Sequence, residues 1–238
     1  LMTVGDIVLM CLIIYLSVKY KKILPILLTI SQTALLLYTE FTAEVVEGPH
    51  MMVDWLTILM CIIIAFIGGF ICIYTVGYMK GYHAHHTDVQ DRQPFFFSML
   101  FLFLAAMFGL VLSQNLIWIY FFWEITSVIS FLMIGYTRTP EAVGNSFCAL
   151  WMNLLGGLGF AVAIALMAQI YGSVQLTDVV QIGALLPLMC LALAGMTKSA
   201  QLPFSTWLLG AMVAPTPSSA LLHSATMVKA GVYLLIRI

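Results

Sequence analysis

Charged residues are scarce in this sequence. Only 8% of its 238 residues are Asp, Glu, Lys or Arg, while 63% are hydrophobic. Because about a quarter of the residues of a soluble domain are charged, the composition excludes a soluble enzyme. Nine basic and ten acidic residues give a net charge of −1 and form no basic cluster. This excludes a nucleic-acid binder, which needs clustered Lys and Arg to neutralise phosphates.

Cysteine motifs are absent as well. The five cysteines lie in apolar runs, and no two have the C-x-x-C spacing that is typical of redox and metal sites. We interpret them as small packing residues and expect no cofactor on this chain. The segment HAHHTDVQDR contains His83, His85 and His86, whose separations of one and two residues are not a zinc-ligand spacing. We predict that this segment is a solvated cytoplasmic loop without a metal.

The apolar runs are long enough to cross a membrane. A span needs roughly 20 apolar residues, because the bilayer core is about 30 Å thick, and backbone groups in lipid must pair within a helix or a closed barrel. The unalternating runs favour helices, so the sequence predicts an all-α membrane protein, a polytopic bundle of about eight transmembrane helices. The predicted spans are 4–18, 23–38, 53–78, 95–112, 116–136, 142–171, 182–209 and 218–238.

Threading these spans back and forth separates the charges of the loops. Only Arg237 breaks the separation, and because positive loops mark the cytoplasm, we predict that the N-terminus lies outside a bacterial or archaeal cytoplasmic membrane. The sequence opens with Leu1, has no signal-peptide pattern and stops within an apolar run, so we expect it to be part of a longer protein. The basic residues on one side are Lys19, Lys21, Lys22, Lys80, Arg92 and Arg138, and the acidic residues opposite are Glu40, Glu44, Glu47, Asp54 and Asp178.

We single out four ionisable side chains inside predicted spans. They are Glu124 in WEITSVIS, Lys198 in MTKSAQLPF, and His223 and Lys229 in LLHSATMVKAGVYLL. A charged side chain at the bilayer centre costs about 2.5–3.5 kcal/mol on the most lenient scale. Such residues therefore indicate function, and we predict that these four form a proton relay.

Polar residues surround the last two of these side chains at helical spacing. Steps of four, three, three and four residues keep side chains on one face of a helix. At 1.5 Å per residue this ladder rises about 21 Å, most of the hydrocarbon thickness. It predicts a polar stripe across the membrane, formed by Ser219, His223, Thr226, Lys229 and Tyr233.

Further features support the same site. Ser127 lies close to Glu124 in sequence, and Asn153 adds a polar side chain to the next span. Pro203 lacks an N–H, and its ring clashes with a helical carbonyl four residues earlier, so the helix should break beside Lys198. Freed carbonyls at membrane depth need protein or a water-filled cavity around them, and broken helices mark ion sites in transporters.

A structural role is the alternative for these residues. Buried Glu–Lys pairs, Ser, Thr and Asn can simply hold membrane helices together. Gly156, Gly157 and Gly159 favour close helix approach in the same way. The combination of four ionisable groups, a proline break and a continuous ladder favours translocation.

At these residues the sequence resembles a known family, the antiporter-like, proton-translocating membrane subunits of respiratory complex I, Mrp-type sodium/proton antiporters and energy-converting membrane hydrogenases. FFWEITSVISFLMIGY resembles the family's fifth helix, with its glutamate at Glu124. KSAQLPFSTWLLGAMVAPTPSSALLHSATMVKAGVYLLIR resembles the broken seventh helix and the eighth helix, with relay positions at Lys198, His223 and Lys229. The resemblance is strong over 53–238, whereas the first two helices match only in order and length.

The resemblance implies a domain organisation. Residues 1–92 are expected to form helices one to three, and 93–238 to form helices four to eight, one half of an inverted repeat with a broken seventh helix. The family's second half is missing from this sequence. Complex I relatives often carry an acid in helix six where this chain has Gly156 and Gly157, which favours an Mrp or hydrogenase type.

The resemblance also suggests a mechanism and partners. Burial disfavours a charged lysine and a nearby carboxylate favours it, so we expect Lys198 to hold its proton when Glu124 is close and to release it toward His223 otherwise. We favour a subunit of a redox-driven ion pump, partnered by other membrane subunits and, through them, by a peripheral arm with iron–sulfur clusters. The alternatives are an Mrp-type sodium/proton antiporter subunit without redox coupling and a purely structural membrane subunit.

Overall fold

The computed structural model describes residues 2–43, 48–86 and 89–238, except for the side chains of residues 224 and 225. Over these ranges the chain is helical apart from loops and two isolated bridges, Met51 with Ser113 and Asn115 with Gln175. The predicted all-α membrane fold is confirmed. Its elements are α1 (Met2–Lys19), α2 (Ile23–Thr42), α3 (Trp55–His85), α4 (Gln93–Leu112), α5 (Leu116–Ile134), α6 (Pro140–Leu166), η1 (Met167–Tyr171), α7 (Leu176–Ile182), α8 (Leu185–Lys198), α9 (Thr206–Gly210), η2 (Ala211–Val213), α10 (Thr216–Ala220), η3 (Leu221–Ala225) and α11 (Met227–Arg237).

Within the described residues, seven helical segments are long and apolar enough to cross a membrane. They correspond to seven of the eight predicted spans. The remaining span, predicted at 182–209, is divided. Its first part, α8, has 14 residues and is about 21 Å long at 1.5 Å per residue, and helical structure resumes in α9 after a loop. The broken helix predicted from the sequence is therefore present.

Local sequence signals explain where several helices begin. Asp54, Asn115 and Thr139 are the N-caps of α3, α5 and α6, and each side chain accepts a hydrogen bond from a backbone N–H two or three residues later. Such caps satisfy donors that the first turn leaves free. Pro140 follows the last of these caps, at the first helical position, where its missing N–H costs nothing.

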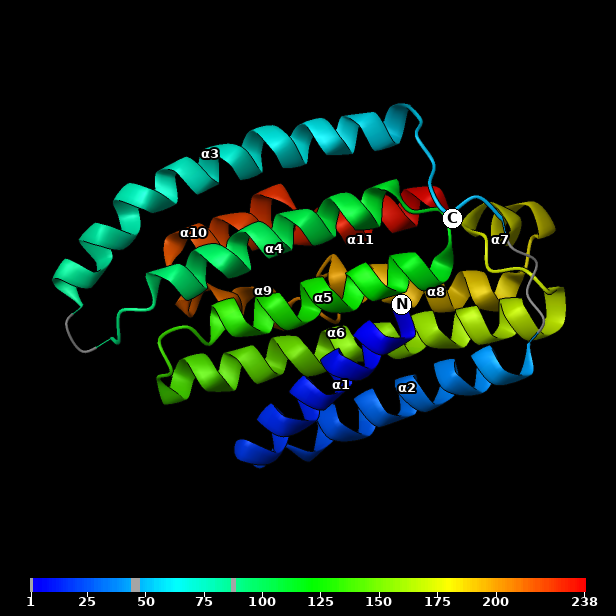
Figure 1. Ribbon diagram of the computed structural model, residues 1–238, viewed down its shortest axis with the longest axis horizontal. Helices are drawn as coiled ribbons and strands as arrows, with labels where there is room; N and C mark the ends of the chain where they lie inside the picture. The colour runs from blue at the N-terminus through cyan, green and yellow to red at the C-terminus, as the bar shows by residue number, and fades with distance from the viewer. Residues whose placement is uncertain (1, 44–47, 87–88) are drawn as a thin grey trace.

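The helices lie side by side along the long axis of the molecule, as Figure 1 shows. The bundle is centred on α5 and α6, with α3 on one outer side and α1 and α2 on the other. α6 packs against α2, α5 and α8, and α1 packs against α2 and α5. α8 in turn packs against α11. This order places Glu124 of α5 and Lys198 of α8 in the interior. It also packs α1 against α5 and brings Gln32 of α2 to Tyr120 of α5.

The helix order also separates the loop charges. α1, α3 and α5 end, and α2, α4 and α6 begin, at one end of the bundle (Figure 1), which carries the basic residues flanking these helices. Glu40, Asp54 and Asp178 belong to the opposite end. Two further residues of the predicted acidic loops, Glu44 and Glu47, lie outside the described residues.

Arg237, the basic residue at the acidic end, forms an ion pair. Its Nη1 lies 2.5 Å from Asp54 Oδ2, and its Nη2 donates to Asp54 Oδ1 at 2.7 Å and to Thr57 Oγ1 at 2.7 Å. The hydrogen bonds from Arg237 hold the pKa of Asp54 well below its usual range. The pair thus ties the end of α11 to the start of α3.

This pair predicts a pH dependence of stability. A lowered folded-state pKa stabilises the fold above the unfolded value of about 3.9, and that stabilisation is lost as pH falls below it. Because the Asp54 side chain is 42% exposed, we expect the loss to be about 1 kcal/mol or less. The apparent Tm of the purified protein should therefore fall more steeply with acid in the wild type than in Arg237→Gln. Identical acid profiles for the two would contradict this assignment.

Candidate functional site

Glu124 is buried in the middle of α5. The residue is only 4% exposed, and neither carboxylate oxygen has a hydrogen-bond partner among the described residues. The carboxylate lies against α6 at Gly157, where any Cβ would collide with Oε1. Glycine at this position therefore makes the room that the carboxylate occupies. A buried oxygen without a partner costs about 1–3 kcal/mol, so Glu124 carries a cost that packing alone does not explain.

Lys198 is the last residue of α8 and is fully buried. Its Nζ donates to Ser127 Oγ at 2.8 Å and to the Trp123 carbonyl at 2.9 Å. It also lies 4.7 Å from the centroid of the Trp123 ring, within the range of a cation–π interaction. Both acceptors are on α5, on either side of Glu124 in sequence, so the amine of α8 is held beside the helix that carries the acid.

Lys198 and Glu124 do not form a direct ion pair. None of the described carboxylates lies within ion-pair distance of the Lys198 ammonium. The close approach expected to hold the lysine proton is therefore not made in this conformation, and the partners of Lys198 are Ser127 and Trp123 instead. An ammonium has three N–H donors, and two are accounted for here. The relay roles of both residues stay predictions.

The break after Lys198 follows the sequence signal. α8 ends at Lys198, the backbone turns at Ala200 with φ of 53°, and Pro203 lies in the loop before α9. Trp207 Nε1 donates to the carbonyl of Thr197 at 2.9 Å, which satisfies one of the acceptors that a helix end leaves free. The end of α8 is thus fixed by protein contacts, and Lys198 is held in place with it.

The predicted ladder on the last span is not one continuous face. A π-helical turn, η3 (Leu221–Ala225), interrupts this span. A π turn adds a residue, so steps of three and four across it no longer superimpose side chains. The prediction of a single interior stripe is therefore wrong. Thr226 and Tyr233 are buried, Ser219 and His223 are half-buried, and Lys229 is exposed.

Two of these side chains, Thr226 and Tyr233, make buried hydrogen bonds, whereas His223 has a buried nitrogen without one. Thr226 Oγ1 donates to the carbonyl five residues earlier at 2.8 Å, so it closes the π turn. The Tyr233 hydroxyl donates to the Val111 carbonyl at 2.8 Å, which holds α11 against α4. His223 Nε2 is buried without a hydrogen-bond partner in the described part of the chain. His223 is therefore the ladder residue with an unused polar atom inside the protein.

α6 brings the helices of the site together through small residues. A Cβ at Gly156 would collide with the Thr197 side chain on α8, and one at Gly159 would lie 3.0 Å from a carbonyl oxygen of the same helix. These glycines allow the close approach that the sequence suggested. Asn153 is buried, and its Nδ2 donates to the carbonyl four residues earlier at 2.8 Å, while Oδ1 has no partner among the described residues.

The residues predicted from the sequence did not include the polar side chains of α1 and α2 that face this site. Asp6, Thr29, Gln32 and Thr33 line a small cavity together with Glu124. Tyr120 OH donates to Gln32 Oε1 at 3.2 Å. Two signals were available: a carboxylate inside the predicted span 4–18, and the spacing of three polar residues at i, i+3 and i+4 on one face of the next helix.

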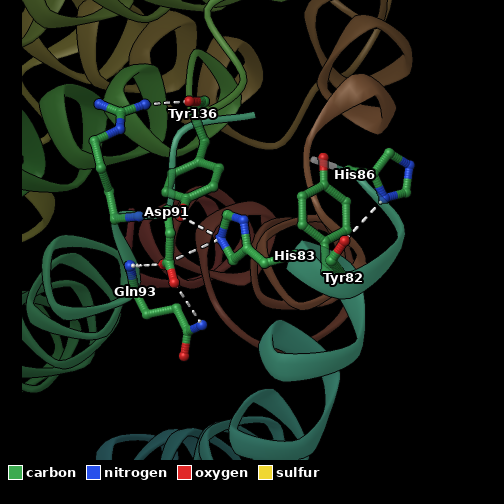
Figure 2. A network of polar contacts seen from close by, with 7 residues as sticks. Tyr82, His83, His86, Asp91, Gln93 and Tyr136 are labelled. Carbon is green, nitrogen blue, oxygen red and sulfur yellow. Dashed lines mark hydrogen bonds and ion pairs between the residues drawn. The ribbon is translucent and has the colours of Figure 1, made fainter. Parts of the chain in front are cut away.

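The structure of the histidine segment also differs from the predicted loop. α3 extends to His85, so His83 lies in its last turn and not in a solvated loop. Figure 2 shows its ring between Tyr136 and Asp91, with Nε2 3.0 Å from the Tyr136 hydroxyl and 3.5 Å from Asp91 Oδ1. The Arg92 guanidinium donates to the Tyr136 carbonyl. Burial raises the pKa of Tyr136 further above its usual value. These polar contacts of His83 and Tyr136 allow α3 to continue beyond its apolar run. They join the end of α3 to the start of α4 and to the end of α5.

Comparison with known proteins places this geometry in a family. Residues 113–238 match the family described as "NADH:quinone oxidoreductase/Mrp antiporter, TM". Residues 49–87 match "NADH-Ubiquinone oxidoreductase (complex I), chain 5 N-terminus". The first match covers α5, α6, α8 and α11, and so includes Glu124 and Lys198.

Individual relatives belong to cation/proton antiporters. The chain is 38% identical over 203 residues to a probable K(+)/H(+) antiporter subunit of Rhizobium meliloti (strain 1021), covering 79% of this chain and 20% of that protein. It is 38% identical over 194 residues to one Na(+)/H(+) antiporter subunit of Staphylococcus haemolyticus (strain JCSC1435), covering 78% and 23%. A chain in the structure of the Mrp complex from Dietzia sp. DQ12-45-1b is 33% identical, with a TM-score of 0.64 over 78% of this chain and 20% of that one.

The chain thus spans about a fifth of the length of these relatives. The match at 113–238 nevertheless covers more than half of this sequence, and it includes the helices whose buried acid and amine were identified from the residues themselves. This chain belongs to the family of antiporter-like membrane subunits shared by NADH:quinone oxidoreductases and Mrp antiporters.

Proposed function

We propose that this chain is the ion-translocating part of an Mrp-type cation/proton antiporter subunit. The sequence favoured a redox-driven pump, with the antiporter subunit as the alternative. The relatives named above are K(+)/H(+) and Na(+)/H(+) antiporter subunits, and they support the alternative better than the redox-driven version. They give no support for an iron–sulfur arm.

The observation that carries the proposal is the buried acid and amine between α5 and α8. Glu124 is 4% exposed with two oxygens that lack partners among the described residues, and Lys198 is 0% exposed with hydrogen bonds to α5. A buried charge left without its partner is strongly destabilising, so holding these helices together does not explain Glu124. Groups held near one another but unpaired are suited to exchanging a proton.

The contacts suggest an order for the transfer. We propose that a proton passes between Glu124 and Lys198 by way of the Ser127 hydroxyl, which accepts from the Lys198 ammonium. The unused Nε2 of His223 supports His223 as the next carrier. Water would have to connect it to Lys198, because no hydrogen bond among the described residues joins the two side chains. Lys229 lies on the surface of this chain, where we propose that it exchanges protons with the remainder of the subunit.

We further propose a setting for the chain. The Dietzia relative belongs to an Mrp complex, which supports assembly with other membrane subunits. The basic residues at one end of the bundle support a cytoplasmic position for that end, with the start of α1 outside a bacterial or archaeal cytoplasmic membrane.

An antiporter and a redox-driven pump differ in the energy source that drives transport. The complete complex that contains this chain, reconstituted in liposomes with an imposed pH gradient, should dissipate the gradient when Na⁺ or K⁺ is added and no electron donor is present. A pH-sensitive dye inside the liposomes measures this, and choline chloride at equal ionic strength is the control. A complex that moves protons only when an electron donor is oxidised would overturn the antiporter proposal in favour of the redox pump.

A further inference from the structure

A small cavity lies against the Glu124 carboxyl, on the side of α5 that faces α1 and α2. Its volume is about 10 Å³, and Asp6, Thr29, Gln32 and Tyr120 are among the residues that line it. This is about the space that one water molecule needs. Gln32 is fixed by its hydrogen bonds to Tyr120 and to the Leu154 carbonyl. The small cavity therefore has a rigid polar wall.

Three of the residues that line the small cavity carry unpartnered oxygens. Glu124 is 4% exposed and Thr29 is 3% exposed. Both Glu124 oxygens, Thr29 Oγ1 and Asp6 Oδ1 are buried without a hydrogen-bond partner among the described residues. Since buried polar atoms are rarely left unpaired, four such oxygens around one small space point to a transferable proton or a water there.

Asp6 also lines a second, larger cavity. This outer cavity has a volume of about 530 Å³ and lies at the start of α1 and the end of α2, where Glu40, His50 and Asn115 line it as well. Thr3 Oγ1 donates to Glu40 Oε1 at 3.0 Å in its wall. Of the described residues, Asp6 alone lines both the outer and the small cavity. Asp6 therefore lies between Glu124 and the end of the bundle that is opposite the basic residues.

We propose that Asp6 passes protons between the outer cavity and Glu124, so that α1 and α2 form an access route to the relay. This inference rests on the proposed function of Glu124 and Lys198. Asp6 in its acid form gives its O–H proton to water in the small cavity, and that water gives one of its own protons to the Glu124 carboxylate. The Asp6 carboxylate then takes a proton from a hydronium ion in the outer cavity, which leaves neutral water there. Only O–H bonds form and break, and one proton moves inward per cycle.

Thiol accessibility tests the route without depending on transport. Asp6→Cys is compared with Val8→Cys, whose side chain is on the same helix, 61% exposed and outside both cavities. Both are made in the complete complex after its native cysteines have been replaced. A membrane-impermeant thiosulfonate added from the side that the start of α1 faces should modify Asp6→Cys at least tenfold faster. Equal rates would overturn the access route.

Transport then tests the role of the Asp6 carboxyl. Asp6→Asn should slow cation-driven proton exchange at least tenfold, while Asp6→Glu, which keeps a titratable group, should restore most of the rate. If assembled Asp6→Asn complexes exchange normally while Lys198→Met complexes do not, the access inference fails and the proposed function stands. If both exchange normally, the proposed function fails. Should Asp6→Asn not assemble, Asp6→Glu decides: a normal rate supports the relay, and loss of exchange in assembled complexes rejects it.

Discussion

Replacing Lys198 with methionine is expected to abolish most cation-driven proton exchange while leaving the complex assembled. Methionine has a similar length but cannot carry a proton, and proton carriers typically contribute 10²–10⁴-fold to rate. We therefore expect a fall of at least about a hundredfold. The measurement is dye-reported proton exchange in liposomes, normalised to the amount of complex recovered by size-exclusion chromatography.

The cost of this substitution in stability should be small enough to allow the test. Removing the ammonium takes one donor each from Ser127 Oγ and the Trp123 carbonyl, but that carbonyl still accepts from the Thr126 and Ser127 hydroxyls, so the cost is at most about 1–3 kcal/mol. Relief from burying a charge offsets part of that cost. Methionine also fills a volume close to that of lysine, so the packing at the end of α8 is largely kept.

Ser127→Ala is the matched comparison for Lys198→Met. It removes the 2.8 Å hydrogen bond from the amine but keeps the amine itself. Because water can take the place of the Ser127 hydroxyl on the path between the two carriers, Ser127→Ala should lower the rate less than tenfold. Unimpaired exchange in assembled Lys198→Met complexes would reject Lys198 as the carrier. An equally severe Ser127→Ala would show that water does not replace the hydroxyl on this path.

Glu124→Gln should have an effect of similar size and a different stability signature. The carboxamide has nearly the shape of the carboxylate but cannot titrate, so exchange should again fall at least about a hundredfold. Neither Glu124 oxygen bonds to a described residue, so the substitution removes no protein contact. The apparent Tm of the complex should stay the same or rise, because a buried charge is removed.

This prediction separates translocation from a purely structural role. If Glu124 merely held helices together, Glu124→Gln would lower the Tm and assembly while the surviving complexes transported normally. Ser130→Ala is the matched control, because Ser130 is buried on the same helix and its hydroxyl donates to a backbone carbonyl. That variant should exchange protons within about twofold of the wild-type rate.

The membrane class, most helix positions and the break after Lys198 could be predicted from the order of the residues alone. These follow from local physics: hydrocarbon thickness sets the length of an apolar run, and Pro203 cannot continue a helix. The same physics singled out Glu124 and Lys198, because ionisable groups in apolar runs are costly wherever the helices end up.

Which of these groups lie close together depends on how the helices pack in the tertiary structure. Lys198 donates hydrogen bonds to Ser127 and Trp123 and not to Glu124. These partners depend on how closely α5 and α8 approach each other across α6. The π turn before Thr226 separates Lys229 from the buried face, and the spacing of an ideal helix could not reveal it. The place of Asp6 beside Glu124 likewise depends on how α1 and α2 pack against α5, because contacts between distant segments are set by packing and not by the local pattern.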